Sequence, residues 1–254
     1  MTALRPCIID GEAGDCGRLP DGLCVCQNIR TVGHRGLGVD RHLEVLGIAA
    51  REVLGLRLSI SPQTLASQIE QLLAGNGYPS DGLSFVAVRQ YLTGQLAIVA
   101  NELSPYRQRR MRMIFPKAAI VDYELPFSEH RTSLSESAVQ MALADVRRLS
   151  PYIKAVLRRN SFGHIISADG APLFIVENGG IIAPPPVVPS AEFDAAAEAI
   201  QKAGLPLATD TVDTDRLLQA EELFFADHRG ITAVAECEGH IYIHLTAARI
   251  GDLY

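Results

Sequence analysis

The segment PLFIVENGGIIAPP, residues 172–185, contains two short runs of apolar residues that are typical of strands, with paired glycines at the turn between them. The prolines at 184–186 interrupt the chain after the second run. A helix is predicted over 190–203, and Gly204 ends it. Two strands followed by a helix indicate a domain that mixes both kinds of element.

Strand and helix patterns occur on both sides of this segment. Upstream, the sequence predicts helices over 39–56 and 61–77 and an alternating strand over 83–92. Downstream, it predicts a short helix and further strands. We therefore predict an α+β protein of two domains, with an N-terminal α/β domain (1–122), a linker (123–133) and a C-terminal domain (134–254).

A further helix is predicted to begin at Ser133, because Ser133 and Glu136 have the spacing of a capping box. Apolar residues then recur at helical spacing and are expected to share one face. They are Leu134, Ala138, Met141, Ala142 and Leu149. Asp145 falls on the same face and interrupts it.

Composition restricts the classes of partner. The 254 residues carry a net charge of −6, which argues against nucleic acid as the main partner. The basic run at 107–113 is interpreted as an exposed face of a strand or turn. No apolar run approaches the length of a membrane span, and the N-terminus lacks a signal-peptide pattern, so we expect a cytoplasmic protein without a membrane partner.

The five cysteines are odd in number, and Cys24 and Cys26 should share one face of a strand. Buried thiols are the simpler interpretation, and a metal site of cysteine and histidine is the alternative. His240 and His244 also share a strand face, but their spacing lacks a third ligand. We predict no metal site.

Four segments, in order, carry a family resemblance. They are CQNIRT with DRHLEVL, VAVRQYLTG, PLFIVENGGIIAPP, and LLQAEELFFADHRGITAV. Together they resemble the class IV aminotransferase family, which includes branched-chain and D-amino-acid aminotransferases and aminodeoxychorismate lyase. The resemblance implies a small N-terminal domain, a larger barrel-like C-terminal domain, a homodimer, and a ligand site between the domains. It also implies transferase or lyase chemistry, if the chain is an enzyme.

The same resemblance implies pyridoxal phosphate as cofactor, and the residues that would hold it are missing. Val45 stands at the position of the phosphate-binding arginine, and Ser167 at that of the carboxylate that holds the ring nitrogen. The Schiff-base lysine should lie at about 131–135, where Arg131 is the only cation, and a guanidinium cannot form the imine. We predict that the chain no longer binds this cofactor in the family's manner.

Further phosphate-binding residues of the family are absent as well. The Gly-Ile-Thr-Arg phrase does not follow the prolines, and Ala226 and His228 replace two threonines. Lys154 is the alternative Schiff-base amine, if the chain is a true pyridoxal phosphate enzyme. Lys117 and Lys202 are expected to be solvated.

A small anion, either a carboxylate or a phosphate, is the ligand that the remaining residues favour. Arg89, Arg131, His228 and Arg229 are the predicted ligand-binding residues. His228 and Arg131 are the candidate catalytic residues, and His228 suits acid–base chemistry near neutral pH. Alternatively, Arg229 forms a surface ion pair with Asp227, and His228 is a satisfied turn residue. A purely structural dimer or partner-binding module is a third possibility.

Overall fold

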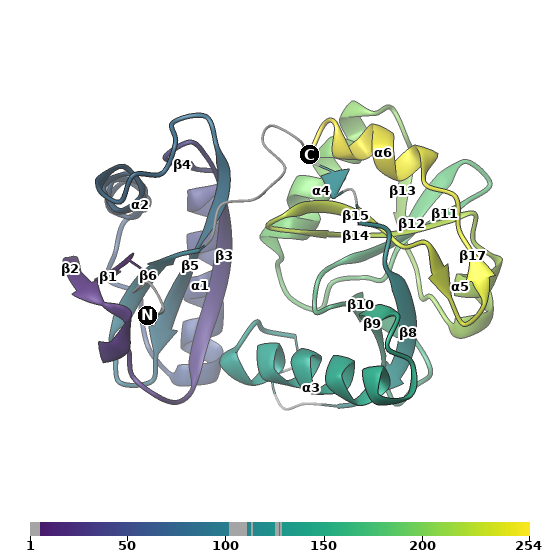
Figure 1. Ribbon diagram of the computed structural model, residues 1–254, viewed down its shortest axis with the longest axis horizontal. Helices are drawn as coiled ribbons and strands as arrows, with labels where there is room; N and C mark the ends of the chain where they lie inside the picture. Colours follow the sequence, from purple (N-terminus) through teal and green to yellow (C-terminus); the bar gives the residue numbers. More distant parts are fainter. Residues whose placement is uncertain (1–5, 102–110, 113, 125–126, 128) are drawn as a thin grey trace. The chain divides into compact units, whose positions relative to one another are not determined.

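The structure is a computed structural model that describes residues 6–101, 111–112, 114–124, 127 and 129–254 (Figure 1). It contains two compact units. The first unit consists of the described residues of Met1–Gln108 and of His130–Leu134. The second consists of those of Arg109–Glu129 and of Ser135–Tyr254. Each unit is described by itself.

The first unit contains a six-stranded antiparallel sheet with the order β2-β1-β6-β5-β3-β4. Its strands are β1 (Pro6–Ile9), β2 (Glu12–Asp15), β3 (Cys24–Val32), β4 (Arg35–Gly36), β5 (Leu83–Tyr91) and β6 (Leu96–Ala100). A 3-10 turn, η1 (Cys16–Arg18), follows β2. The alternation predicted over 83–92 is therefore confirmed as β5.

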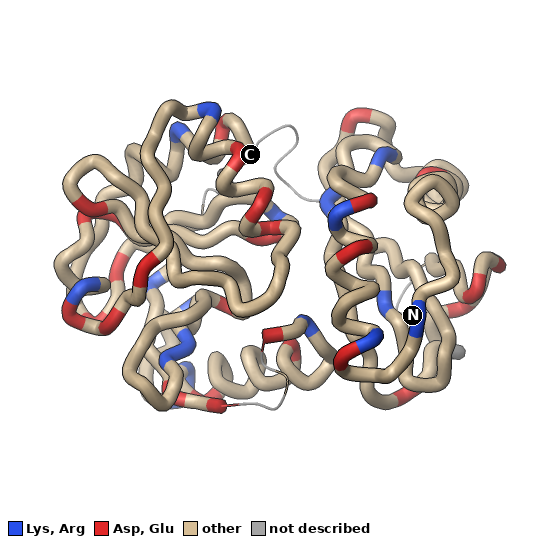
Figure 2. Tube along the Cα trace, turned by 180° about the vertical axis from the view of Figure 1, so that it is seen from behind, with Lys and Arg blue, Asp and Glu red and all other residues tan. Residues whose placement is uncertain are grey.

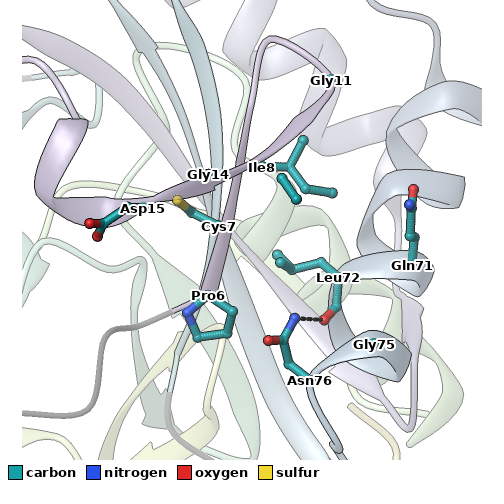
Figure 3. A pocket seen from close by; sticks show the side chains of 11 residues that line it. Pro6, Cys7, Ile8, Gly11, Gly14, Asp15, Gln71, Leu72, Gly75 and Asn76 are labelled. Atoms are coloured by element: carbon teal, nitrogen blue, oxygen red, sulfur yellow. Dashed lines mark hydrogen bonds between the residues drawn. The ribbon is translucent and has the colours of Figure 1, made fainter.

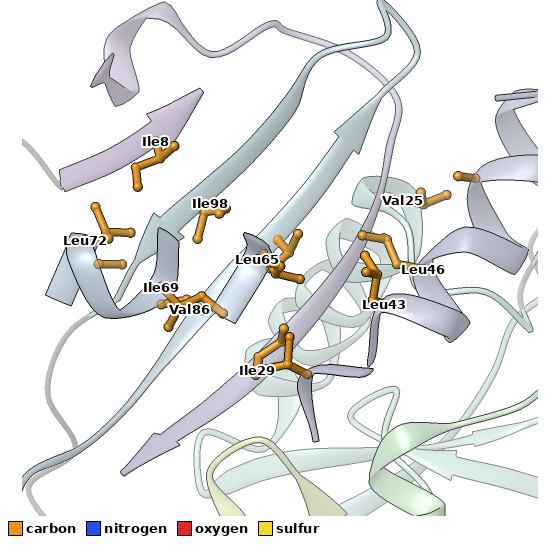
Figure 4. Close-up of a cluster of buried hydrophobic side chains, with 14 of the residues drawn as sticks. Ile8, Val25, Ile29, Leu43, Leu46, Leu65, Ile69, Leu72, Val86 and Ile98 are labelled. Carbon is orange, nitrogen blue, oxygen red and sulfur yellow. The ribbon is translucent and has the colours of Figure 1, made fainter. Parts of the chain in front are cut away.

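Two helices, α1 (Val39–Leu54) and α2 (Pro62–Gly75), pack against one face of this sheet. Gly55 ends α1 in a left-handed conformation with φ of 69°. Ser61 begins α2, since its hydroxyl accepts a hydrogen bond from the backbone N–H of Thr64. Figure 4 shows how β3, β5 and β6 contribute aliphatic side chains that meet those of both helices. This cluster is the core of the first unit.

The second unit contains two sheets. The five-stranded sheet, in the order β10-β9-β8-β16-β17, consists of Ile165–Ala168, Ile153–Arg159, Lys117–Asp122, Glu236–Cys237 and His240–Ile241. The six-stranded sheet, in the order β13-β12-β11-β14-β15-β7, consists of Leu207–Thr209, Gly180–Ala183, Leu173–Glu177, Glu222–Asp227, Gly230–Ala233 and Met111–Arg112. Its helices are α3 (Ser133–Leu149), whose first two residues belong to the first unit, α4 (Ala191–Lys202), α5 (Thr214–Gln219) and α6 (Leu245–Gly251).

Side chains from both sheets share one core in the second unit. Leu157 of β9 and Leu223 of β14 belong to the same buried cluster, so the inner faces of the two sheets meet. The outer face of the six-stranded sheet packs against α4 and α6, and that of the five-stranded sheet packs against α3. Two curled sheets that enclose one core form the barrel-like domain predicted for the C-terminal part, and the α+β prediction is confirmed.

The segment at 172–185 forms the hairpin of β11 and β12. Val176 pairs with Ile181, and the turn between the strands contains Asn178 and Gly179 with φ of 50° and 76°. An Asn-Gly pair is favoured at this turn, because both central residues need a positive φ. β14 pairs with the other edge of β11, and the hairpin therefore lies within the six-stranded sheet.

The division into units differs from the predicted boundaries of 122 and 133. β8, which the prediction placed in the first domain, pairs with β9 and β16 in the second unit. The 130–134 segment, predicted as linker up to 133, pairs with β3 through a bridge between Val25 and Thr132. Both differences arise because these short segments pair with strands that are distant in sequence.

The predicted helix from Ser133 is confirmed as α3, but its buried face differs from the predicted one. Leu134, Met141 and Leu149 have relative exposures of 45%, 72% and 93%. Val139 and Leu143 are buried instead. The apolar pattern therefore describes two faces of this helix.

Basic and acidic residues are interspersed along the described part of the chain (Figure 2). Most of the basic run at 107–113 lies outside the described residues. Within the residues that the structure describes, no helix has the length and apolarity needed to cross a bilayer.

Candidate functional site

The two faces of the first unit's sheet differ in chemistry. In β3, Val25 and Ile29 point toward α1 and α2 and belong to the core. Because successive side chains of a strand alternate, the residues between them point the other way. On this side, a group of residues that we call the polar face comprises Cys24, Cys26, Asn28 and Arg30 of β3, Arg89 and Tyr91 of β5, and Arg131. Next to it on the same side, Cys7, Ala87, Ala97 and Val99 form small buried apolar clusters.

Backbone pairing places Arg89, Cys26 and Arg131 in a row across the polar face. Cys26 is the register partner of Arg89 in the pair of β3 and β5. On its other side, the N–H of Cys26 donates to the carbonyl oxygen of Arg131 over 3.0 Å. Directly opposed residues share a sheet face, so both arginines lie on the same side, one strand apart from Cys26 on either side.

The spacing of this row suits an anion. Neighbouring strands are about 4.8 Å apart, which separates the two arginine backbones by about 10 Å. Arginine side chains are long enough to converge over Cys26, where planar guanidinium groups bind carboxylate or phosphate oxygens in pairs. The structure therefore brings together two of the four predicted ligand-binding residues.

Tyr91 lies two residues from Arg89 on the polar face. Burial raises the pKa of its hydroxyl above the ordinary value of 10.0, although a hydrogen bond with Arg89 opposes the shift. The phenol is therefore protonated at neutral pH and adds a hydrogen-bond donor beside the arginine row.

His228 and Arg229, the other two predicted residues, lie in the second unit at the turn between β14 and β15. Asp227 pairs with Gly230, so the two residues form the centre of the turn. His228 is buried and Arg229 is exposed. The carboxylate of Asp227 accepts a hydrogen bond from the backbone N–H of Arg229 over 2.7 Å. This bond shapes the turn and uses the backbone of Arg229.

The chain has three lysines, and all of them face solvent. Lys154, the alternative Schiff-base amine, is exposed on β9. Lys117 forms an ion pair with Glu236 over 2.5 Å, and its side chain is 49% exposed. Lys202, 61% exposed, is 3.6 Å from Glu198, one turn earlier on α4. An imine-forming lysine normally needs a desolvated pocket or a neighbouring cation, and these positions offer no burial.

Asp169 lies near the position at which the family's carboxylate would hold the ring nitrogen of pyridoxal phosphate, but its carboxylate has a structural role. Asp169 has a φ of 49° and forms a tight turn with Gly170. One of its carboxylate oxygens accepts a hydrogen bond from the backbone N–H of Val156 over 2.9 Å. Ser167, at the position of the family's carboxylate, lies in β10 beside a register irregularity. Asp169 therefore stabilises the start of a hairpin and the adjacent strand.

The start of α4 follows the prolines, where the family's phosphate-binding phrase is missing. The Ser190 hydroxyl already accepts a hydrogen bond from the backbone N–H of Phe193 over 3.2 Å. Glu192 and Asp194 lie in the first turn, and Glu192 is buried. Two carboxylates satisfy the positive end of the helix dipole and repel a phosphate.

Val45, which the resemblance places at the position of the family's phosphate-binding arginine, lies in α1. Val45 is buried, and His42, three residues earlier, is also buried. The Nδ1 atom of His42 lies 2.9 Å from Oε1 of Gln27 on β3. His42 therefore helps to pack α1 against the sheet.

A cavity of about 540 Å³ lies between the β1–β2 hairpin and the last turns of α2 (Figure 3). Within it, the side-chain amide of Asn76 donates a hydrogen bond to the carbonyl oxygen of Leu72. The carboxylate of Asp15 adds a negative charge to its wall. Among the residues that the structure describes, no basic side chain and none of the predicted site residues lines it. Its chemistry does not suit an anion.

In the described part of the chain, no three His, Cys, Asp or Glu side chains gather as metal ligands.

A family model for "Amino-transferase class IV" matches residues 27–237, which is most of the chain. The chain belongs to this family. No curated protein matches the sequence significantly.

Structures of class IV aminotransferases have the same fold. A branched-chain aminotransferase from Thermoproteus uzoniensis is 17% identical, with a TM-score of 0.82 over 98% of this chain and 93% of that one. An aminotransferase from Brucella abortus bound to the cofactor PLP is 14% identical, with a TM-score of 0.82 over 99% and 98%. A putative 4-amino-4-deoxychorismate lyase from Legionella pneumophila is 16% identical, with a TM-score of 0.70 over 87% and 85%.

Sequence reasoning missed two features of this class IV chain. The row of Arg89, Cys26 and Arg131 depends on pairing between β3 and a segment 105 residues later, which no local pattern signals. The acidic start of α4 was visible in the sequence, since Glu192 and Asp194 directly follow the capping Ser190.

Proposed function

We propose that this class IV protein has lost pyridoxal phosphate binding in the family's manner and binds a small anion, a carboxylate or a phosphate. The observation that carries the first part is the solvent exposure of all three lysines. A cofactor held as an imine needs an amine inside its pocket, and Lys117, Lys154 and Lys202 lie elsewhere.

The remaining cofactor contacts support the same proposal. The start of α4 carries Glu192 and Asp194 in place of phosphate-binding groups. Val45 is apolar and buried where the family has an arginine. The carboxylate of Asp169 is engaged by a backbone N–H. These residues do not fit the phosphate or the ring of the cofactor.

The row of Arg89 and Arg131 supports anion binding on the polar face. Charge-assisted hydrogen bonds from two guanidinium groups favour a ligand with at least two acceptor oxygens. Tyr91 adds a neutral donor on the same side of the sheet. Anion binding by His228 and Arg229, and acid–base catalysis by His228, stay predictions.

The alternative is a true pyridoxal phosphate enzyme, an aminotransferase or lyase of the transferase class, in which Lys154 supplies the amine. The fold that the chain shares with the cofactor-bound Brucella abortus structure favours this alternative.

A cytoplasmic location and a homodimer belong to the proposal as well. All five cysteines lie in the described residues, and none forms a disulfide there.

Ligand-induced thermal stabilisation tests the proposal. Purified wild-type protein would be heated with a panel of small monocarboxylates, dicarboxylates, inorganic phosphate, phosphate monoesters and pyridoxal phosphate. A ligand that binds only the folded state raises the melting temperature with concentration. We expect a shift with at least one dicarboxylate or phosphate monoester, and hits would be measured by calorimetry.

The outcomes separate the two parts of the proposal. Stabilisation by an anion, with no stronger effect of pyridoxal phosphate, supports both parts. A flat response to every anion contradicts the ligand proposal. A response to pyridoxal phosphate alone, with an absorption band of an imine, would favour the enzyme alternative.

A further inference from the structure

Two cysteines meet at the edge of the first unit's sheet, on the side opposite α1 and α2. Cys7 lies in β1, and Cys16 begins the turn η1 directly after β2. Cys7 is 2% exposed in a small apolar cluster, and Cys16 packs against that cluster. A hydrogen bond joins the two thiols. Neither thiol belongs to the proposed anion site.

Strand pairing places the Cys7 thiol beside β2. Cys7 is the register partner of Gly14, so both residues face the same side of the sheet. A Cβ atom at Gly14 would lie 3.6 Å from Sγ of Cys7, and the thiol therefore lies over a residue that has no side chain. Figure 3 shows the sulfur of Cys7 pointing away from Leu72 of α2. Cys16, two residues after Gly14, returns to the same side.

The turn η1 brings Cys16 back over this side. The carboxylate of Asp15 accepts a hydrogen bond from the backbone N–H of Gly17 over 2.9 Å. The backbone N–H of Leu19 donates to the carbonyl oxygen of Cys16 over 3.3 Å. These bonds curl the chain directly after β2, and Leu19 also packs against the cluster that contains Cys7. Local backbone geometry therefore holds the two cysteines together.

We propose that Cys7 and Cys16 are a redox site, which a low-molecular-weight disulfide converts reversibly into an internal disulfide. Diagonal neighbours on paired strands have Cα atoms about 7–8 Å apart, and a disulfide spans up to about 6.8 Å. A shift of about 1 Å at η1 is therefore enough. Because β2 is an edge strand with residues 12–14 exposed, little packing opposes that shift.

Exposure assigns the order of the two steps. Of the five cysteines, all of which lie in the described residues, Cys16 alone is not fully buried. Its thiolate attacks one sulfur of the small disulfide, and the other half leaves as a thiolate that takes up the proton lost by Cys16. Cys7 then attacks Sγ of Cys16, and the second small thiolate leaves with the proton of Cys7. Two protein thiols are oxidised, and one small disulfide is reduced to two thiols.

The second step should be the slower one. Burial, followed by the hydrogen bond and the charge of Cys16 and the charge of Asp15, raises the pKa of Cys7 to about 12. Its thiol is therefore protonated near neutral pH, and a protonated thiol is a poor nucleophile. The mixed disulfide on Cys16 should accumulate before the internal disulfide forms.

Oxidation with glutathione disulfide tests the proposal. Reduced full-length protein, freed of reductant, would be incubated at about pH 8, quenched with acid at intervals and analysed by intact mass. Asp10 and Glu12 lie between the two cysteines, so a protease specific for acidic residues separates them for non-reducing peptide mapping. The wild type should gain one glutathione, lose it again, and end with a bond between Cys7 and Cys16 that dithiothreitol reverses.

Three variants separate the two thiols from the others. Cys7→Ser should stop at the mixed disulfide on Cys16. Cys16→Ser should take up glutathione about tenfold more slowly, because its remaining thiols are buried. Cys237→Ala is the matched control, since Cys237 is a buried thiol of the second unit, and it should form the internal disulfide as the wild type does.

Four results would overturn the proposal. They are a wild type that stays unmodified, a wild type that stops at the mixed disulfide, a bond from Cys16 to Cys24 in place of Cys7, and a Cys237→Ala variant that no longer forms the bond. Circular dichroism would check the folding of each variant, and the wild-type peptide map decides the matter even where a variant does not fold. No step uses pyridoxal phosphate or the anion, so the result is independent of the proposed function.

Discussion

The two faces of the N-terminal sheet have different chemistry although they share the same strands. The helix-covered face presents Val25, Ile29, Val86 and Ile98 to α1 and α2, and all four are buried. The polar face presents Arg89 and Arg131 on either side of Cys26, together with Tyr91 and Arg30. The two sets alternate along the same strands, because successive side chains of a strand point to opposite faces.

This difference bears on our proposal that the chain keeps its family's fold and has a changed site. Apolar residues of suitable size keep a core folded, even when few are identical to those of relatives. The match to the Thermoproteus uzoniensis enzyme, at 17% identity and a TM-score of 0.82, is consistent with that tolerance. A binding site depends on particular functional groups. Replacing one residue is enough to remove the group that this residue supplies.

The largest effect is expected on the helix-covered face. Leu65 of α2 is fully buried in the core cluster, so Leu65→Ala should lower the free energy of unfolding by about 2–5 kcal/mol. Urea unfolding measures the change. Anion affinity of the folded variant should match that of the wild type. A loss below about 1 kcal/mol would show that this face does not carry the stability of the unit.

Arginine replacements on the polar face should show the opposite behaviour. Arg89→Ala and Arg131→Ala should each weaken anion binding by about 10–100-fold, because each removes charge-assisted hydrogen bonds. The free energy of unfolding should change by less than about 1 kcal/mol. Calorimetry with the anion found by thermal screening measures the affinity.

Arg51→Ala is the control for these arginines, since Arg51 is exposed near the end of α1. It removes the same charge without touching the polar face, and the affinity should stay within about twofold of the wild type. Equal losses for Arg51→Ala and Arg89→Ala would show that net charge, and not the arginine row, determines binding.

An alkaline pH series should reveal the buried thiol on β1. Burial, followed by the hydrogen bond and the charge of Cys16 and the charge of Asp15, raises the pKa of Cys7 from 9.0 to about 12. Between these values the unfolded thiol is ionised while the folded one is protonated. The contribution of Cys7 to the free energy of unfolding should therefore be constant below pH 9 and fall as the pH rises toward 12. Burial also raises the pKa of Cys237 to about 12, so Cys7→Ala should reduce the alkaline decline without abolishing it. An unchanged slope would assign the decline to other groups.

The smallest effect is expected at a surface ion pair on α1. Arg41 and Glu44 are 2.8 Å apart, with side chains 37% and 57% exposed. Arg41→Ala should lower the free energy of unfolding by less than about 0.5 kcal/mol and leave anion affinity unchanged. A larger loss of stability would mean that charges outside both faces help to hold the unit together.

The sequence predicted local features better than long-range ones. Strand alternation in 83–92, the helix start at Ser133 and a turn between the two strand runs of 172–185 follow from neighbouring residues, and all three are present. The burial of Val139 in place of Met141 was missed, because both faces of α3 are apolar and periodicity cannot rank them. The proximity of Arg89 and Arg131 was beyond the sequence for a similar reason, since it depends on which strands pair.

Borohydride reduction tests the central claim most directly. Purified wild-type protein would be incubated with pyridoxal phosphate, reduced, and analysed by intact mass and peptide mapping. We predict no absorption band of an internal imine and only traces of adduct spread over Lys117, Lys154 and Lys202, as expected for exposed amines. One cofactor bound per chain on a single lysine, and lost in Lys154→Ala, would contradict the account.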